Sequence, residues 1–267
     1  MYSLFPVLDL SHLALTIFFS VLIACISYWL KFLTASGSVA TFLLACIVYG
    51  IGDWKWTVPI LTFFLLSSVL SKIGKYKKQQ YESLFEKTGT RDWGQVLANG
   101  GIAGAIVLVQ SSLPDFNFYP LYLGAIAAVT ADTWGTEIGL LFHRKTISVT
   151  RFAAVEPGSS GGISLPGFLG GVIGAAIISM SSFFWIMEPQ IFIITVLAGF
   201  AGSLADSILG GLVQASYQCD ICRKITERRE HCGAPTEFIK GVRWINNDVI
   251  NGFCAFTGML IAYIFTL

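Results

Sequence analysis

Apolar residues fall along this chain in long blocks, without the alternating or every-third-residue spacing of soluble elements. The longer blocks approach the roughly 20 residues that a helix needs to cross the apolar part of a bilayer. The second and third blocks are short, so we expect them to tilt or to pack as a hairpin. The pattern predicts an all-α polytopic transmembrane bundle of about eight spans, near 13–30, 36–52, 56–71, 96–112, 119–142, 165–187, 190–213 and 247–267.

Composition supports lipid, and not water, as the solvent of these helices. Apolar residues make up 54% of the chain and charged residues 12%, with a mean hydropathy of +0.69, whereas a soluble domain carries about 25% charged residues. Residues 1–10 contain no Lys or Arg, so the first block is expected to be a true span and not a cleavable signal. The net charge of +1 does not predict a nucleic-acid partner.

Basic residues are distributed asymmetrically between the expected loops. Sixteen of the 17 lie at Lys31 or in segments 72–95, 143–164 and 214–245, and only Lys55 lies on the other side. Because short loops rich in Lys and Arg stay in the cytoplasm, these segments are expected there and both termini outside. The expected location is a bacterial-type plasma membrane.

The second half of the chain contains a possible internal repeat. Two glycine-rich runs, 100–106 and 170–176, are each followed about thirty residues later by an Ala-Asp pair, ending at Asp132 and Asp206. The fourth and fifth spans would then repeat as the sixth and seventh, in parallel. Chance similarity between spans rich in small residues is the alternative, since such residues also serve close helix packing.

Four carboxyl groups lie within or at the ends of predicted spans: Asp132, Glu137, Asp206 and Asp248. A charge at the bilayer centre costs about 2.5–3.5 kcal/mol, so each needs a partner, a cavity or a function. The predicted topology places them toward the cytoplasmic side, together with Asn99, Ser203, Asn247 and Asn251. Asp132 and Glu137 are about 140° apart on a regular helix, so a shared site requires local unwinding or a cavity that wraps around the helix. Hydrogen-bonded clamps between helices are the alternative for each residue.

The segment from Glu156 to Ser164 is rich in glycine and serine and precedes an apolar helix. Its free N–H groups would favour an anion, and Arg144, Lys145 and Arg151 lie nearby in sequence. The segment lacks the lysine of a nucleotide-binding P-loop, so it predicts phosphate binding only in combination with the carboxylates, and an ordinary linker is the alternative. Its candidate phosphate contacts are Ser159, Ser160, Gly161 and Gly162.

The predicted loop 214–245 contains four soft metal ligands: Cys219, Cys222, His231 and Cys232. The C-x₂-C spacing followed by a second ligand pair predicts a tetrahedral Zn²⁺ site. A redox pair of cysteines is the alternative, and it would leave His231 and Cys232 without a role. Structural disulfides are not expected in a cytoplasmic loop.

Five motifs resemble a known family of membrane proteins, which includes plant phytyl-phosphate kinase and animal transmembrane protein 19. They are Asn99-Gly100-Gly101, ADTWGTEIG at 131–139, PGSSGGIS at 157–164, GSLADSILGG at 202–211 and WINNDVIN at 244–251. The Cys/His loop is similar to that of bacterial relatives. The resemblance divides the chain into N-terminal helices with a basic loop, 1–94, and a core domain, 95–267, that carries the Cys/His loop.

The resemblance implies a kinase that transfers a phosphate from a nucleoside triphosphate, CTP in the plant case, to an isoprenoid (prenyl or phytyl) monophosphate in the membrane lipid. The carboxylates, in particular Asp132, Asp206 and Asp248, are then expected to hold Mg²⁺, with Glu137 beside them. Asn99, Asn247 and Asn251 are expected to orient phosphates, and Lys240 and Arg243 to meet the charge of the nucleotide. A transporter or flippase of a phosphorylated lipid or small anion is the main alternative, and a non-catalytic scaffold the third.

Overall fold

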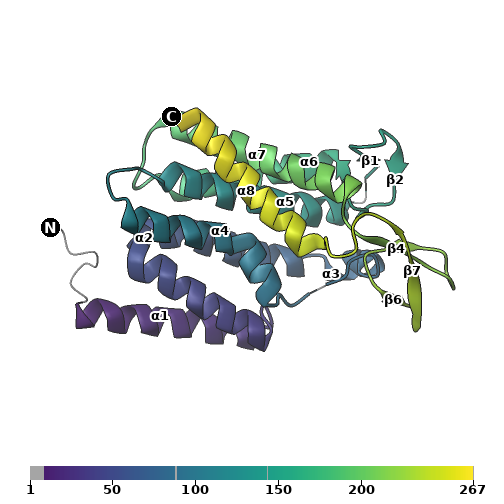
Figure 1. Cartoon of the computed structure of the whole chain (residues 1–267), viewed down its shortest axis with the longest axis horizontal. Helices are drawn as coiled ribbons and strands as arrows, with labels where there is room; N and C mark the ends of the chain where they lie inside the picture. Colours follow the sequence, from purple (N-terminus) through teal and green to yellow (C-terminus); the bar gives the residue numbers. More distant parts are fainter. Residues whose placement is uncertain (1–8, 88, 143, 267) are drawn as a thin grey trace.

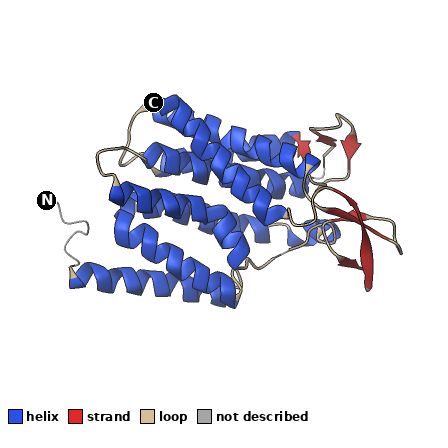
Figure 2. Ribbon diagram, viewed as in Figure 1, coloured by secondary structure: helices blue, strands red, loops and turns tan. Residues whose placement is uncertain are grey.

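The computed structural model describes residues 9–87, 89–142 and 144–266. Long helices lie side by side as a bundle, and short strands gather at one end of it (Figure 2). The helices are α1 (Leu10–Trp29), α2 (Ala35–Lys72), α3 (Lys75–Lys78), α4 (Trp93–Ser112), α5 (Tyr119–Phe142), α6 (Leu165–Ser181), α7 (Pro189–Leu212) and α8 (Asn247–Thr266), with a 3₁₀ turn, η1, at Gln79–Tyr81.

Helix α2 is a hairpin of two arms, 35–52 and 54–72, joined at Asp53, where φ is 58° and ψ is −164°. Both arms have one end near the turn that follows α1. The first arm begins there at Ala35, and at the end of the second arm the Lys72 Nζ donates a hydrogen bond to the Leu30 carbonyl at 2.5 Å. This is the paired arrangement expected for the two short apolar blocks.

Helix α5 is the centre of the bundle and packs against α2, α4, α6, α7 and α8. Every residue of α5 from Tyr119 to Ala131 is buried. Small residues allow this close packing: a methyl group added at Gly202 of α7 would lie 2.8 Å from the Cys254 carbonyl of α8. Asp132 and Glu137 therefore follow directly on the buried part of the central helix, which fixes their position.

The expectation of an all-α fold is corrected by two small antiparallel sheets. The first has the order β2-β1-β3, formed by Ala154–Val155, Thr146–Ser148 and Gly162–Ser164. The second has the order β5-β4-β7-β6, formed by Ile225–Thr226, Ser216–Cys219, Ala234–Lys240 and Glu230–His231. Both lie in segments predicted as loops, where hairpins pair backbone groups that a loop would leave to water. The predicted span 165–187 also ends earlier, at Ser181.

Within the described residues, five helices are long and apolar enough to cross a membrane: α1, α2, α4, α7 and α8. Helix α6 is apolar but shorter, so the count of eight spans stays a prediction. The start of α1 and the end of α8 lie at the end of the bundle opposite the sheets (Figure 1). The three basic segments all lie at the sheet end, and their assignment to the cytoplasm remains a prediction.

The two glycine-rich runs of the possible repeat have different packing partners. A methyl group at Gly100 or Gly104 would meet Leu44 of α2, whereas one at Gly171 or Gly174 would meet residues of α5. The parallel repeat therefore stays a prediction.

Candidate functional site

A cavity of about 680 Å³ lies at the sheet end of the bundle, among α2, α4, α5, α6, α7, α8 and the segments that join them. Most of the predicted site residues line it: Asn99, Asp132, Glu137, Ser159, Ser160, Gly161, Gly162, Ser203, Asp206, Asn247 and Asn251. Asp248, Lys240 and Arg243 are not among its lining residues. The cavity wraps around α5, so Asp132 and Glu137 both reach it without unwinding of that helix.

Asp132 of α5 and Asp206 of α7 both line this cavity and lie close enough for their charges to interact. The Oδ2 of Asp206 is shielded from solvent and has no hydrogen-bond partner among the described residues. Two neighbouring carboxylates repel each other unless a proton or a cation lies between them. The pair therefore fits an oxygen-preferring cation such as Mg²⁺, with the unpartnered oxygen as an available ligand.

Glu137 is joined to Lys78 of α3 by an ion pair of 2.5 Å. The Lys78 Nζ also donates to the carbonyls of Leu70 and Ser71, at 3.0 and 3.2 Å, so it caps the last turn of α2. Lys78 is buried. Glu137 thus holds a buried cation at the cavity wall.

Asp248 lies at the start of α8, and its carboxylate accepts from the Lys87 Nζ at 2.5 Å. Asp92, the N-cap of α4, lies 2.8 Å from the same nitrogen. Burial acts to lower the pKa of Lys87, but the hydrogen bonds that Lys87 donates to Asp248 and Asp92 outweigh it and raise the pKa. Asp248 therefore positions a charged lysine that lines the cavity, although Asp248 itself is not among the lining residues.

Sequence reasoning missed the cations of the cavity, because it used the basic residues of 72–95 only to assign topology. The lining includes Lys31, Lys72, Lys75, Lys78, Lys87 and Arg91. The two residues that had been assigned to the nucleotide lie elsewhere: the Lys240 Nζ donates to the Gly211 carbonyl at 2.7 Å, and Arg243 stacks on the Phe238 ring at 5.1 Å. The signal in the sequence that could have indicated these cations is the cluster of lysines just after α2, Lys75, Lys77 and Lys78.

The Gly/Ser segment forms one wall of the cavity and packs directly on α7. Gly161 has a φ of 78°, and a methyl group there would lie 2.7 Å from the Ser207 carbonyl. Glycine is therefore required at position 161 both by the backbone conformation and by the close packing on α7. Ser164 caps α6 by accepting from the Gly167 N–H at 3.2 Å, and both residues line the cavity. The positive end of the α6 dipole therefore faces the site.

Glu227, which sequence reasoning did not select, joins this wall to the second sheet. The Ser160 hydroxyl lies 3.0 Å from Glu227 Oε1 and 2.9 Å from Gln214 Oε1. Burial raises the pKa of Glu227, although the hydrogen bonds from Ser160 and from the Glu86 N–H oppose the shift. No short motif marks this glutamate in the sequence, because its contacts come from segments far apart.

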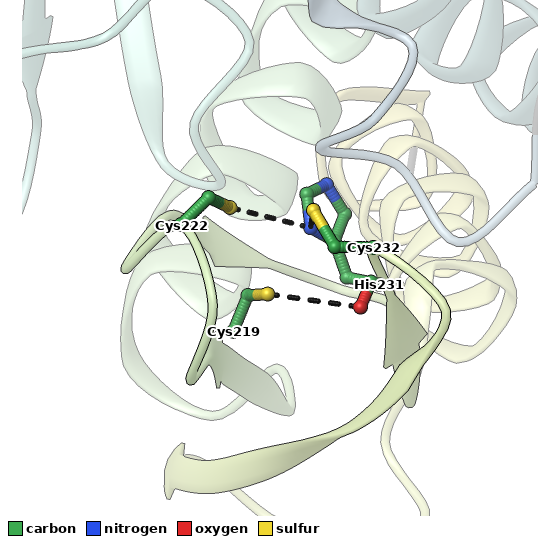
Figure 3. A group of neighbouring side chains, drawn as sticks. All are labelled: Cys219, Cys222, His231 and Cys232. Atoms are coloured by element: carbon green, nitrogen blue, oxygen red, sulfur yellow. Dashed lines mark hydrogen bonds between the residues drawn. The ribbon is translucent and has the colours of Figure 1, made fainter.

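The four predicted soft ligands lie together in the second sheet (Figure 3). Their ligand atoms are all within 4.8 Å of one another, and the Cys222 and Cys232 sulfurs lie 3.4 and 3.2 Å from His231 Nδ1. A tetrahedral zinc site with zinc–sulfur bonds of about 2.3 Å places its sulfurs about 3.8 Å apart. The cluster can therefore hold a metal ion, and its donor set fits zinc.

The Cys219 and Cys232 thiols of this cluster differ in acidity. Hydrogen bonding from the Cys222 N–H lowers the pKa of Cys219 to about 6. The neighbouring Cys222 side chain raises the pKa of Cys232 to about 11. A cation bound among the sulfurs would stabilise both cysteines as thiolates, since the thiolate is the metal-binding form.

The sheet that carries the Cys/His cluster also anchors the segment that leads to Lys87. The Thr226 Oγ1 donates to the Ser83 carbonyl at 2.8 Å, and the Glu227 N–H to the Leu84 carbonyl at 2.8 Å. Arg228 donates to the carbonyls of Phe85 and Glu82, at 2.8 and 2.9 Å. The Cys/His sheet and the cavity are thus one connected structure.

Apolar helices around a polar, charge-lined cavity at one end are the arrangement of an integral membrane protein. The family described as integral membrane protein DUF92 matches residues 18–259, so the chain belongs to that family. The family predicted from the motifs is confirmed.

Relatives of this chain occur in plants and archaea. Protein PGR of Arabidopsis thaliana is 30% identical over 90% of this chain and 91% of its own length. The uncharacterized membrane protein MJ0933 of Methanocaldococcus jannaschii is 30% identical over 77% of this chain and 87% of its own. Protein VTE6, chloroplastic, of Arabidopsis thaliana is 24% identical over 86% of this chain and 64% of its own. No solved structure matches.

Proposed function

We propose that this protein is a membrane-embedded kinase that transfers a phosphate from a nucleoside triphosphate, CTP or a similar nucleotide, to an isoprenoid monophosphate with Mg²⁺. One observation supports this function above the others. A single cavity is lined by two neighbouring carboxyl groups, Asp132 and Asp206, and also by several lysines and Arg91. Phosphoryl transfer needs this combination of metal ligands and cations around multiply charged phosphates.

Within this proposal, Asp132 and Asp206 hold Mg²⁺, which neutralises charge on the transferred phosphate when bound. Asn99, Asn247 and Asn251 orient phosphate oxygens from the opposite wall. Lys87, held in place by Asp248, would neutralise phosphate charge, whereas Lys78 is already engaged by Glu137 and two backbone carbonyls. Ser164 and the start of α6 direct N–H groups at an anion.

The proposed reaction needs little proton transfer. An oxygen of the isoprenoid monophosphate, already ionised, attacks the γ-phosphorus of the nucleotide. The bond from that phosphorus to the bridging oxygen breaks, and the nucleoside diphosphate leaves with its electron pair. The product is an isoprenoid diphosphate. Catalysis would therefore depend on positioning and charge neutralisation more than on a general base.

A transporter or flippase would need a polar path to the far end of the bundle. Residues 121–131 of α5, which lead up to Asp132 in the cavity, are all buried, and only Tyr122 and Thr130 among them are polar. Both hydroxyls are used within the bundle, donating to the backbone carbonyls of Trp56 and Ile126. This buried, mostly apolar part of α5 favours a site that opens at one end only, and so favours an enzyme over a transporter.

A phosphotransfer assay of the purified protein tests the function. CTP and ATP are each supplied with Mg²⁺ and a panel of prenyl monophosphates, and the lipid products are separated. The expected result is conversion of a monophosphate to its diphosphate, abolished by EDTA. Folded protein that converts none of the panel, but moves a labelled lipid phosphate across vesicle membranes, would favour the flippase.

We also propose that Cys219, Cys222, His231 and Cys232 hold a structural Zn²⁺. All four positions carry protein ligands, which is typical of a structural and not a catalytic zinc site. Its effect on the cavity would be indirect, through the contacts of Thr226, Glu227 and Arg228.

A further inference from the structure

The cavity contains an apolar corner that differs from the rest of its lining. Phe168 and Val172 of α6 and Phe200 and Leu204 of α7 all line the cavity. Within each helix the two residues are four apart, so they lie on one face. The Phe168 and Phe200 rings pack edge to face, with centroids 5.5 Å apart. This corner therefore lies where α6 and α7 meet.

The two phenylalanines of this corner also lie at the exposed surface of the bundle, whereas Val172 and Leu204 are half-buried. Phe168 is 41% exposed and is followed by Leu169, which is 50% exposed; Phe200 is 36% exposed and lies one turn from the exposed Leu197. The cavity wall at this point thus consists of apolar side chains with lipid beyond them.

Small residues of the two helices line the cavity next to this corner. Gly167 and Gly171 of α6 and Ser203 and Ser207 of α7 are among the lining residues, and Ser203 lies one turn before Asp206. Helices α6 and α7 pack closely at Gly199, where a methyl group would lie 2.6 Å from the Ala175 side chain. Gly161 packs closely against α7 as well. The lining of one cavity therefore includes both the carboxylate pair and this corner, with small residues beside them.

We propose that this corner, defined by Phe168, Val172, Phe200 and Leu204, is a lateral window through which the hydrocarbon tail of the lipid monophosphate leaves the cavity and enters the bilayer. The inference rests on the proposed function and adds where its lipid substrate binds. A membrane lipid cannot withdraw its tail into a polar cavity, because each exposed methylene costs about 0.8 kcal/mol. The opposite part of the lining is polar and basic, with Lys31, Lys72 and Lys75, and suits the nucleotide phosphates instead.

Narrowing the window tests this inference. Val172→Trp adds bulk inside it, and Ile173→Trp is a matched control on the next residue, which is 52% exposed and does not line the cavity. The measured quantity is the ratio of kcat/KM for a long-chain prenyl monophosphate to that for a short, water-soluble one. We expect Val172→Trp to lower this ratio at least tenfold and Ile173→Trp to leave it within twofold of wild type. An equal effect of both variants, or an unchanged ratio in Val172→Trp, would overturn the window.

A binding measurement separates this inference from the proposed function. A prenyl monophosphate with a photoreactive diazirine in its tail is bound to the wild-type protein, illuminated, and the adducts are mapped by mass spectrometry. Adducts on α6 and α7 that decline in Val172→Trp support the window even if no phosphotransfer occurs, in which case the kinase proposal fails alone. Phosphotransfer with adducts confined to α1, α2 or α4 would reject the window and retain the kinase.

Discussion

Asp132 and Asp206 are the residues for which packing and catalysis predict different results. If they hold Mg²⁺, Asp132→Asn and Asp206→Asn should each lower the phosphotransfer rate about 10²-fold, a loss of roughly 2.7 kcal/mol in transition-state stabilisation. Folding should survive, because a neutral isostere removes a desolvation cost. Initial rates and thermal unfolding in detergent measure the two effects on the same preparations.

Asp53→Asn is the matched control for these variants, since Asp53 lies at the tip of the α2 hairpin and does not line the cavity. It should leave the rate unchanged. A fall in unfolding temperature as large as the fall in rate for Asp132→Asn would indicate a helix clamp and contradict the catalytic role.

The ion pair between Lys78 and Glu137 predicts non-additive stability. Glu137→Gln should destabilise the protein by about 3 kcal/mol, because it leaves the buried Lys78 charge without a counter-ion. Replacing both, as Lys78→Met with Glu137→Gln, should cost less than the sum of the single changes. Unfolding of the four proteins in one detergent gives the coupling energy, and additive effects would show that the pair is not coupled.

Which site residues could be predicted depended on the cost of burying them. Asp132 and Asp206 stand out in sequence because carboxylates are expensive within apolar spans. Lys78 and Arg91 do not, because basic residues at the end of a span are ordinary signals of topology. Lys240 lies just before the 244–251 motif, but its Nζ donates to the Gly211 carbonyl. Only tertiary contacts distinguish these lysines.

Helix α2 turns at Asp53 with a backbone conformation that is almost confined to glycine. Asp53→Gly should therefore stabilise the protein by about 1 kcal/mol. Asp53→Ala is the control, because it removes the same side chain but keeps the Cβ, and it should not stabilise. Thermal unfolding of the two variants checks this, and equal stabilities would contradict the strain.

The Cys/His sheet should transmit metal loss to the cavity wall. Cys219→Ser is expected to remove the metal, which we predict as about one zinc per chain, and to loosen the second sheet. Because Thr226, Glu227 and Arg228 bond the backbone of residues 82–86, hydrogen exchange there should rise as well.

Cys25→Ser is the control for this variant, since Cys25 is an exposed residue of α1. Elemental analysis and exchange mass spectrometry are the measurements. Zinc-free wild-type protein with slow exchange at 82–86 would exclude the structural metal.

Helices were predictable from the sequence because span-length apolar blocks have few other stable arrangements in lipid. The sheets were not, since most of their strands have two to four residues, too few for a pattern of period two to be distinguished from a loop. Only β7, Ala234–Lys240, is long enough to alternate, with every second residue exposed. This alternation is a feature of the structure, because the exposed and the half-buried positions of β7 both mix apolar and polar residues.

Basic residues are concentrated at one end of the molecule, and its orientation in the membrane is a separate question from its fold. The cavity, both sheets and the basic segments share that end, whereas the α2 hairpin turns at the other (Figure 1). Lys55 lies two residues after this turn. Lys55 is held there by Tyr119, whose hydroxyl donates to its carbonyl at 2.8 Å. Charge asymmetry therefore predicts that the site faces the cytoplasm.

Labelling of intact cells with a membrane-impermeant maleimide tests this orientation. Gln80→Cys and Ile225→Cys, both at the sheet end, should label no more than wild type until the membrane is permeabilised. Lys55→Cys, at the opposite end, should label in intact cells and serves as the control for expression and reactivity. The physical reason is that translocating the sheet end would carry 16 of the 17 basic residues across the membrane. Labelling of residue 80 or 225 before permeabilisation would reverse the topology and place the nucleotide-facing cavity outside the cell.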